Sequence, residues 1–315
     1  MQNPNTQFFY ISHRGFGKKS FLRYQKTNKL QSVANQLTGL ELGLEKGANT
    51  LEIDLCKTKD GEIITAHPFL LTKQLQFTKE EYLSNHPEAL TFNELVEWFL
   101  RQNDDLYLYL ELKSFISIKN IIEVIDRYKN NVTKNNQRNA LKRLYSNIFL
   151  YTHNLSQIKS LLSEKQHLKL TTMQLPLFWV SLTLVTKKAI DEISNFGSAE
   201  CKLCGIEQGM IPWGLKSFLV LLSIFGFVPP FQQMKYYLSN LEKIVSYAHK
   251  KNLLFFVGSI DNKFFIKDFM SKGVDGIVPN DPSIFSELDQ HKYLQKTSKG
   301  KITYMPLSMK ERLIL

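Results

Sequence analysis

Two acidic residues, Glu52 and Asp54, alternate with apolar residues in the segment Leu51-Glu52-Ile53-Asp54-Leu55. Alternate side chains of a β-strand point to the same face, so the two carboxylates share one face of the predicted strand. Like charges this close repel each other, and they are tolerated mainly where a cation lies between them or where water reaches both. The pair therefore indicates a candidate metal site, although a lone Glu-x-Asp pair is more often a solvated strand face.

Two histidines follow neighbouring predicted strands. An Asp60-Gly61 turn leads from the acidic strand into a short apolar run that ends near His67. The first predicted strand, residues 8–12, is followed directly by His13 and Arg14. Histidine is suited to proton transfer near neutral pH, and arginine supplies a fixed positive charge for an anionic substrate. The two strand ends thus predict acid/base chemistry beside the carboxylates.

A third alternating segment, residues 106–113, contributes Glu111 and Lys113 to one strand face. It follows a predicted helix that begins with a capping box formed by Thr91 and Glu94. Glu111 adds a third hard oxygen ligand of the kind that Mg²⁺ and Ca²⁺ prefer. Lys113 adds a second positive charge. Metal-assisted hydrolysis of a phosphodiester would use all of these groups.

Short apolar segments alternate with helical patterns along the rest of the chain. Strands are expected at residues 147–151, 168–172, 201–207, 253–257 and 276–278, and helices at 31–46, 155–164, 240–250 and 263–272. Repeated βα units predict a parallel sheet, and eight of them close into a (β/α)₈ TIM barrel of class α/β. We expect one domain over residues 1–290 and a basic C-terminal tail over residues 291–315.

Two uncharged segments fit this pattern poorly. Residues 218–231 form an apolar insert near the predicted seventh strand, and they are too few to span a bilayer. Residues 170–186 are also uncharged but contain Pro176 and several Thr and Gln. Both are expected to be buried helix or packing between repeats; the alternative for residues 218–231 is a loop at a membrane interface.

The 315 residues carry 40 Lys and Arg against 29 Asp and Glu, a net charge of +11 that favours anionic partners. Residues 17–30, a basic insert after the first strand, hold five of the basic residues and no acid. Three cysteines are too few for a disulfide framework, and the lone Cys201-x-x-Cys204 is read as ordinary thiols in a strand. The N-terminus lacks the pattern of a Sec signal peptide, so a cytoplasmic location is expected.

The chain resembles the glycerophosphodiester phosphodiesterase family. The motifs that carry the resemblance are His-Arg-Gly after strand one, Gly-Ala-x-x-x-Glu-x-Asp on strand two, a histidine thirteen residues beyond that Asp, Glu-x-Lys and the final Gly-Val-Asp-Gly-Ile. The resemblance covers residues 8–285. It implies hydrolysis of glycerophosphodiesters to glycerol 3-phosphate and an alcohol, with one divalent cation, Mg²⁺ or Ca²⁺. The implied roles are metal ligands for Glu52, Asp54 and Glu111, acid and base for His13 and His67, and phosphate binding for Arg14 and Lys113.

The sequence departs from the family pattern at several positions. Only Asn35 remains of the usual Pro-Glu-Asn-Thr segment, and the loop before it is longer. Pro68 follows His67 where relatives commonly have Asp. Residues 257–261 stand where relatives carry Trp-Thr-Val-Asn, so the substrate wall there is altered. The ending at residues 273–282 keeps its resemblance to the family's final strand, which is usually followed by Thr-Asp and a Pro. The changes at Asn35 and in the loop before it lie beside the proposed site, so they bear on substrate preference more than on fold. The missing Asp after His67 weakens any role for that carboxylate but leaves His67 in register.

Two other functions are carried as alternatives. One is a lysophospholipase D-like hydrolase acting on membrane lipids, which residues 17–30 and 218–231 would bring to an anionic membrane surface. The other is a basic, non-catalytic membrane-binding barrel, which predicts the loss of a site residue; none of the seven is lost. Nucleic acid is not an expected partner, because no recognition module is present. His153 follows a predicted strand and is a further candidate for the pocket lining.

Overall fold

The computed structural model describes residues 8–17, 33–67, 76–113, 116, 118–131, 143–144, 147–152, 177–182, 187, 190–191, 203–209, 230–251, 253–258, 260–290, 294–296 and 302–304. The expected basic insert lies almost wholly outside these residues, as do most of residues 218–231, residues 168–172, His153 and Cys201. The expectations placed on those segments stay predictions.

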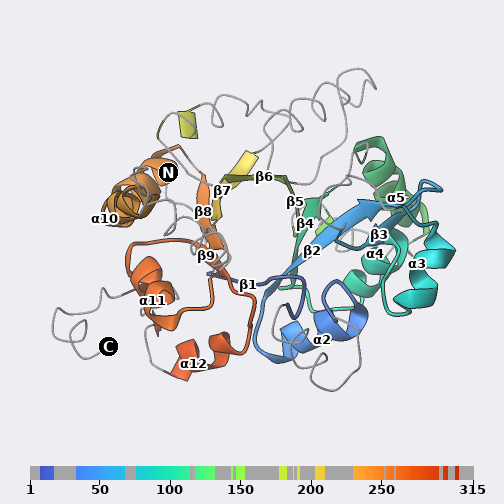
Figure 1. Ribbon diagram of the computed structural model, residues 1–315, viewed down its shortest axis with the longest axis horizontal. Helices are drawn as coiled ribbons and strands as arrows, with labels where there is room; N and C mark the ends of the chain where they lie inside the picture. Colours follow the sequence, from blue (N-terminus) through green and yellow to red (C-terminus); the bar gives the residue numbers. More distant parts are fainter. Residues whose placement is uncertain are drawn as a thin grey trace, which may run out of the picture.

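Eight parallel strands form a closed ring (Figure 1). In ring order they are β1 (Phe9–Ser12), β2 (Thr50–Lys57), β4 (Tyr107–Leu112), β5 (Ile148–Thr152), β6 (Leu177–Leu182), β7 (Leu203–Gly209), β8 (Leu254–Gly258) and β9 (Gly276–Val278). The ring closes because β1 pairs with both β2 and β9. A short strand, β3 (Ile63–Thr65), adds antiparallel to β2 on the outside of this ring. The expected parallel α/β barrel is therefore present.

The described helices lie outside the ring, beside β8, β9, β1, β2 and β4 (Figure 1). They are α2 (Leu37–Glu45), α3 (Lys79–Asn85), α4 (Phe92–Leu100), α5 (Ile118–Asn131), α10 (Pro230–Lys250), α11 (Lys263–Ser271) and α12 (Ile284–Gln290). In the tail, β10 (Leu294–Lys296) and β11 (Ile302–Tyr304) pair antiparallel. Among the described helices, none combines the length and the apolar character that crossing a membrane requires.

The alternation of the strands divides the core into two layers. Leu51, Ile53 and Leu55 of β2 are fully buried between the strands and the helices, in the larger apolar cluster. A second cluster joins residues from several strands inside the ring: Phe9, Ile11, Tyr109, Phe149, Phe256 and Val278. Above it, towards the carboxyl ends of the strands, the same inward face carries Glu52, Asp54 and Glu111. The interior is thus apolar below and acidic above.

Several boundaries differ from those expected. Helix α2 begins at Leu37 rather than at residue 31, because Asn35 adopts a left-handed conformation with φ of 60° that a helix cannot continue through. Residues 177–182, expected to be buried helix or packing, form barrel strand β6. Helix α10 begins at Pro230 rather than at residue 240. Residues 218–229 therefore lie between the sixth barrel strand, β7, and α10, and residues 230–231 begin α10, so the segment does not follow the seventh strand.

Other predicted elements are confirmed. The capping box of α4 is formed by Thr91 and Glu94, whose side chains bond to each other's backbone N–H groups. Strands β4, β8 and β9 and helix α11 fall within one or two residues of the expected ranges. All seven candidate site residues lie within the described part of the chain.

Candidate active site

Three buried carboxylates converge at the carboxyl ends of β2 and β4. Asp54 and Glu111 are direct neighbours in the parallel ladder between these strands, and Glu52 lies two residues before Asp54 on the same face. Each side chain offers an oxygen that lies within 4.8 Å of the others. All three residues are almost completely buried. The strand register therefore delivers the acidic cluster that the sequence predicted.

Two basic side chains contact these carboxylates. Arg14 Nε lies 2.9 Å from Asp54 Oδ2, and the Arg14 backbone N–H donates to Glu52 Oε2 over 2.8 Å. Lys113 Nζ lies 3.2 Å from Asp54 Oδ1 and also pairs with Glu111. Three carboxylates against two basic groups leave one net negative charge when all are ionised. A further cation would reverse that balance and be attracted to the cluster.

The pKa values reflect this crowding. Burial raises the pKa of Glu52 well above its usual range, and the neighbouring carboxylates of Asp54 and Glu111 raise it further. Burial opposes the charge on Lys113, but the carboxylates of Asp54 and Glu111 outweigh it and raise the pKa of the lysine. The site thus keeps Lys113 charged and holds Glu52 in an environment that resists a third negative charge.

His13 lies beside the acidic cluster on the β1 side. Its Nε2 is 3.7 Å from Glu52 Oε2, and its Nδ1 is 2.7 Å from Asn280 Oδ1. Burial, together with the positive charge of Arg14, lowers the pKa of His13 to about 4. The imidazole is therefore neutral at physiological pH.

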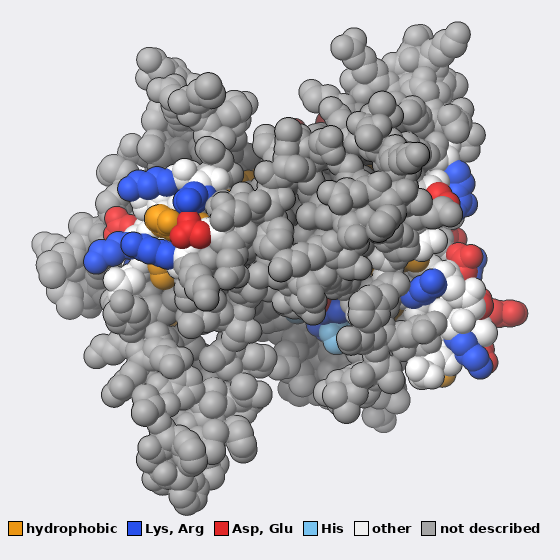
Figure 2. Space-filling model, turned by 90° about the horizontal axis from the view of Figure 1, so that it is seen from above, with side chains coloured by type: hydrophobic (Ala, Val, Ile, Leu, Met, Phe, Trp, Pro, Cys, Tyr) orange, Lys and Arg blue, Asp and Glu red, His pale blue; other side chains and the backbone are white. Residues whose placement is uncertain are grey.

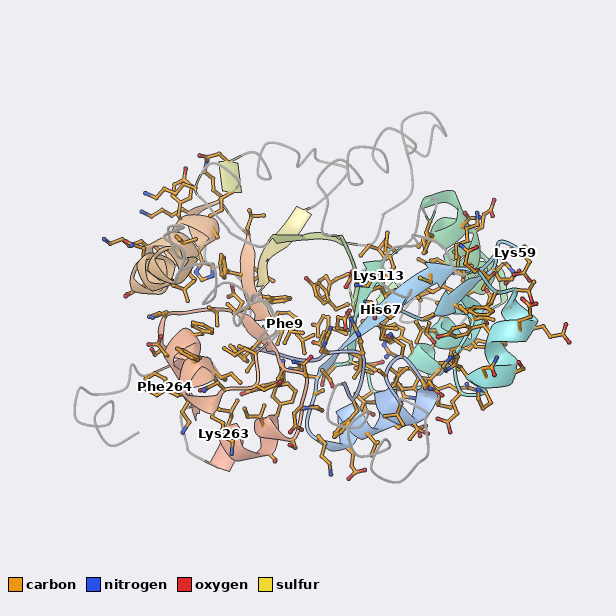
Figure 3. All side chains as sticks on the ribbon, in the orientation of Figure 1. Phe9, Lys59, His67, Lys113, Lys263 and Phe264 are labelled. Atoms are coloured by element: carbon orange, nitrogen blue, oxygen red, sulfur yellow. The ribbon has the colours of Figure 1, made fainter. Side chains whose placement is uncertain are left out.

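His67 reaches the same site from the end of β3. It is more exposed than His13, but the surrounding atoms remove enough water to lower its pKa. The charges of Asp54, Arg14 and Lys113 also act on it, which places it beside the cluster. Figure 3 shows His67 and Lys113 together near β2 and β4, while Phe9 lies on the neighbouring strand β1. In Figure 2 a histidine beside a basic side chain is visible near the middle of the view.

The backbone around Arg14 is tightly fixed. Arg14 has a φ of 56° and the next residue, Gly15, a φ of 74°, so the chain turns sharply after β1. A Cβ on Gly15 would lie 2.6 Å from the backbone carbon of Gly39 in α2, so only glycine fits. This close approach of loop and helix explains why glycine follows His-Arg.

The donor set fits a divalent cation. Asp54 Oδ1 is buried and accepts no hydrogen bond from the described residues, although Lys113 Nζ lies nearby. A buried carboxylate oxygen normally has a donor, and three carboxylates are the oxygen ligands that hard cations such as Mg²⁺ and Ca²⁺ take. Glu52, Asp54 and Glu111 can therefore hold such an ion.

Asn35 is a component of the site to which the sequence reading gave no role. Its Nδ2 donates to Asp54 Oδ2 over 2.8 Å, and its Oδ1 accepts from the Asp54 backbone N–H over 2.9 Å. Thr65 Oγ1 donates to the Asn35 carbonyl from β3. The amide thus clamps Asp54 at two points. Its retention from the Pro-Glu-Asn-Thr pattern was the only signal in the sequence.

All seven candidate residues meet at one edge of the ring. Glu52, Asp54 and Glu111 form the acidic cluster, Arg14 and Lys113 contact it, and the two histidines flank it. This is the edge at which the strands end, where the active sites of (β/α)₈ enzymes are found. Fixed positive charges, two imidazoles and a cation site together can bind a phosphate group and transfer protons around it.

Comparison with known proteins agrees on the fold. No family model matches the sequence, and a search of curated proteins finds no match. Among solved structures, a glycerophosphodiester phosphodiesterase from Thermotoga maritima is 14% identical, with a TM-score of 0.54 over 90% of this chain and 99% of that one. A glycerophosphoryl diester phosphodiesterase from Parabacteroides distasonis is 15% identical, with a TM-score of 0.57 over 96% of this chain and 94% of that one.

A third solved structure, a phosphodiesterase from Oleispira antarctica in complex with the product sn-glycerol-3-phosphate, is 16% identical. Its TM-score is 0.54, over 89% of this chain and 96% of that one. At such identities the likeness is one of fold. The chain therefore has the barrel fold found in solved glycerophosphodiester phosphodiesterases.

Proposed function

We propose that the protein is a metal-dependent phosphodiester hydrolase that cleaves glycerophosphodiesters to glycerol 3-phosphate and an alcohol. The observation that carries the proposal is the convergence of Glu52, Asp54 and Glu111 with two histidines and two basic side chains. The product bound to the Oleispira antarctica phosphodiesterase supports this choice of substrate class. The family resemblance of the motifs supports it independently.

Each group has a proposed role. A divalent cation held by Glu52, Asp54 and Glu111 would neutralise charge on the phosphoryl oxygens. Arg14 and Lys113 bind the phosphate through fixed positive charge, and their pairing with the carboxylates holds them in place beforehand. His13 and His67 are the acid/base pair: one accepts the proton of the attacking oxygen, and the other donates to the leaving alcohol.

The test is a substrate panel. Purified protein is assayed against glycerophosphodiesters and lysophospholipids, with added Mg²⁺ or Ca²⁺ and with EDTA. We expect turnover that EDTA abolishes, and at limiting cation we expect Glu52→Gln to lose activity because one negative ligand is gone. Full turnover in EDTA, or wild-type turnover by Glu52→Gln at limiting cation, contradicts metal dependence. Turnover of no diester at all favours the non-catalytic alternative.

The second candidate, hydrolysis of lipid-like diesters at an anionic membrane, has a structural feature in its favour. Phe264 is 46% exposed at the start of α11, beside Lys263, where the chain leaves the carboxyl end of β8 (Figure 3). Residues 17–30 and 218–231 likewise follow the carboxyl ends of β1 and β7. Aromatic side chains beside basic ones suit an acidic lipid surface. A cytoplasmic protein that binds membranes peripherally would have such an edge.

Co-sedimentation with liposomes tests this candidate. We expect anionic vesicles at low salt to bind the wild-type protein, and Lys18/Lys19/Arg23→Ala and Phe264→Ser to bind less. Phe77→Ser is the comparison variant: Phe77 is likewise exposed, at 50%, but its carbonyl accepts from the Lys59 N–H, so it lies beyond the carboxyl end of β2 and not of β8. Equal binding by all variants, or better cleavage of soluble glycerophosphocholine than of any lysophospholipid, contradicts a membrane substrate.

A further inference from the structure

A chain of hydrogen bonds leads from His13 to Asn280 and on to Asp261, two residues to which the proposed reaction assigns no role. Asn280 Oδ1 lies 2.7 Å from His13 Nδ1. Asn280 Nδ2 donates to Asp261 Oδ2 over 3.0 Å, and the Asn280 backbone N–H donates to Asp261 Oδ1 over 2.7 Å. The Asp281 N–H also donates to Asp261 Oδ1, over 3.1 Å. Asp261 thus uses both carboxylate oxygens in fixing Asn280.

The barrel positions this chain. His13, Asn280 and Asp261 follow the adjacent strands β1, β9 and β8, so the three residues lie side by side along the carboxyl edge of the ring. The loops are also tied through their backbones: the His13 N–H donates to the Pro279 carbonyl, and the Gly17 N–H donates to the Asn280 carbonyl. Asp261 lies in the segment, residues 257–261, where the sequence departs from the family pattern.

The chemistry of the two partners fixes the proton on His13. A carboxylate only accepts hydrogen bonds, so the Asn280 atom that faces Asp261 must be the NH₂ group. The Asn280 atom that faces His13 is then the carbonyl oxygen, which also only accepts. His13 Nδ1 must therefore carry the hydrogen. In the neutral imidazole this leaves the lone pair on Nε2, which faces the acidic cluster 3.7 Å from Glu52 Oε2.

We propose that Asn280 and Asp261 are positioning residues: they hold the His13 ring in one orientation and in the tautomer with hydrogen on Nδ1, which presents the Nε2 lone pair to the reacting centre. This inference rests on the proposed function for its effect on turnover. The hydrogen-bond chain itself is independent of that function. The Asn280 amide oxygen accepts the hydrogen bond from His13 Nδ1 and orients the ring, but it is too weak a base to take the proton. A carboxylate in its place would add a further negative charge beside the acidic cluster.

The experiment combines kinetics with ¹⁵N NMR of the His13 imidazole, whose signals are assigned from their loss in His13→Ala. In the wild-type protein we expect the signature of a hydrogen on Nδ1 and a bare Nε2. In Asn280→Ala we expect a mixture of tautomers, a kcat about 10- to 100-fold lower and a nearly unchanged KM. Asn262→Ala is the matched control, because it removes the neighbouring cap of α11 but leaves the chain intact.

A swap of the two partners provides a stricter test. Asn280→Asp alone sets two carboxylates against each other and should lower kcat as far as Asn280→Ala does. The double variant Asp261→Asn/Asn280→Asp restores a donor facing an acceptor, and it should recover the Nδ1 signature and at least part of kcat. A role in folding alone would lower stability in the variants without this recovery.

Two results would overturn the inference. One is a wild-type His13 with hydrogen on Nε2; the other is an Asn280→Ala variant that keeps both the wild-type tautomer and the wild-type kcat. If the wild-type protein hydrolyses no diester, the proposed function fails, and the NMR comparison alone decides whether Asn280 sets the tautomer. The two failures are therefore distinguishable.

Discussion

Polar side chains gather at both ends of the barrel, but they are used differently. At the amino ends of the strands, Asn49, Asn147 and Asp275 each stand one residue before a strand and bond to the backbone of a neighbouring segment. At the carboxyl ends, Glu52, Asp54 and Glu111 face one another instead. The first arrangement satisfies backbone groups that a closed sheet buries, and the second concentrates charge.

The amino-end contacts show how complete that satisfaction is. Asn49 accepts from the Tyr10 N–H over 2.9 Å and donates to the Phe8 carbonyl over 2.8 Å. Asn147 donates to the carbonyls of Asp104 and Leu106, over 2.8 and 3.1 Å. A buried polar group without a partner costs about 1–3 kcal/mol, so these amides stabilise the fold. Substitutions at this end should cost stability, and those at the other end should cost activity.

The largest expected effect is at the carboxyl end. His67→Ala and His13→Ala should each lower kcat by about 10²- to 10⁴-fold, because a positioned proton-transfer group is lost. For the more exposed His67 the free energy of unfolding should change by no more than about 0.5 kcal/mol. Steady-state kinetics and urea denaturation measure the two quantities.

A diester with p-nitrophenol as leaving group sharpens this prediction. That leaving group needs no protonation, so it should partly rescue only the variant that lacks the acid. Equal rescue of both histidine variants, or of neither, contradicts a fixed division of roles between them.

The next largest effect is the stabilisation of the protein by a cation bound at the carboxyl end of the barrel. A cation that binds the acidic cluster at 100 times its Kd should raise the free energy of unfolding of the wild-type protein by about 2.7 kcal/mol. Glu52→Gln should lose most of that increase, since it removes one negative ligand. Urea denaturation of both proteins with Mg²⁺, with Ca²⁺ and with EDTA measures the increase in the free energy of unfolding. The same increase in both proteins would rule out this cluster as the site of binding.

The third prediction tests the amino end. Asn147→Ala leaves the carbonyls of Asp104 and Leu106 without this donor and should cost about 1–3 kcal/mol in the free energy of unfolding, with kcat unchanged. Asn85→Ala, which removes an amide from the exposed end of α3, is the control and should cost less. If Asn147→Ala impaired catalysis without lowering stability, the contrast between the two ends would be wrong.

The smallest effect is a pH dependence at the amino end. His249 Nε2 lies 2.8 Å from Asp275 Oδ2, and this hydrogen bond raises the pKa of His249 above its ordinary value of 6.5. The pair's contribution to stability is therefore fully present below about pH 6.5 and is lost as the pH rises through the higher folded-state pKa. Because the His249 side chain is 41% exposed, solvent screening limits the contribution of the His249–Asp275 pair to stability to under about 1 kcal/mol.

His249→Gln provides the comparison for this pH dependence. Glutamine can still donate to Asp275, but it does not titrate. The difference in unfolding free energy between the wild type and His249→Gln, measured from pH 5 to pH 9, should shrink as the pH rises. A difference that grows with pH would contradict the direction of the His249 shift.

The sequence predicted the acidic end of the barrel well because two simple rules apply there. Alternation places Glu52 and Asp54 on one face of a strand, and parallel strands bring their carboxyl ends to one edge. Strand β6 was not predicted, since periodicity alone does not tell a short uncharged, largely apolar run in a strand from buried helix. The amide contacts of Asn35 and Asn280 were also missed. They depend on the register and loop geometry of segments far apart in the chain, which no local pattern encodes.

The closure of the ring between β1 and β9 also determines when the site can form. His13 and Asn280 are 267 residues apart, and the Glu52 side chain and the β1 loop meet only once β1 lies against β2. A chain growing from its amino end therefore carries every residue of the acidic cluster long before the partner of His13 has been synthesised. Contacts of such long sequence separation form late and slowly in folding. The orientation of His13 thus reports on the completion of the barrel, and a partly folded chain would hold the cluster's residues without an oriented His13.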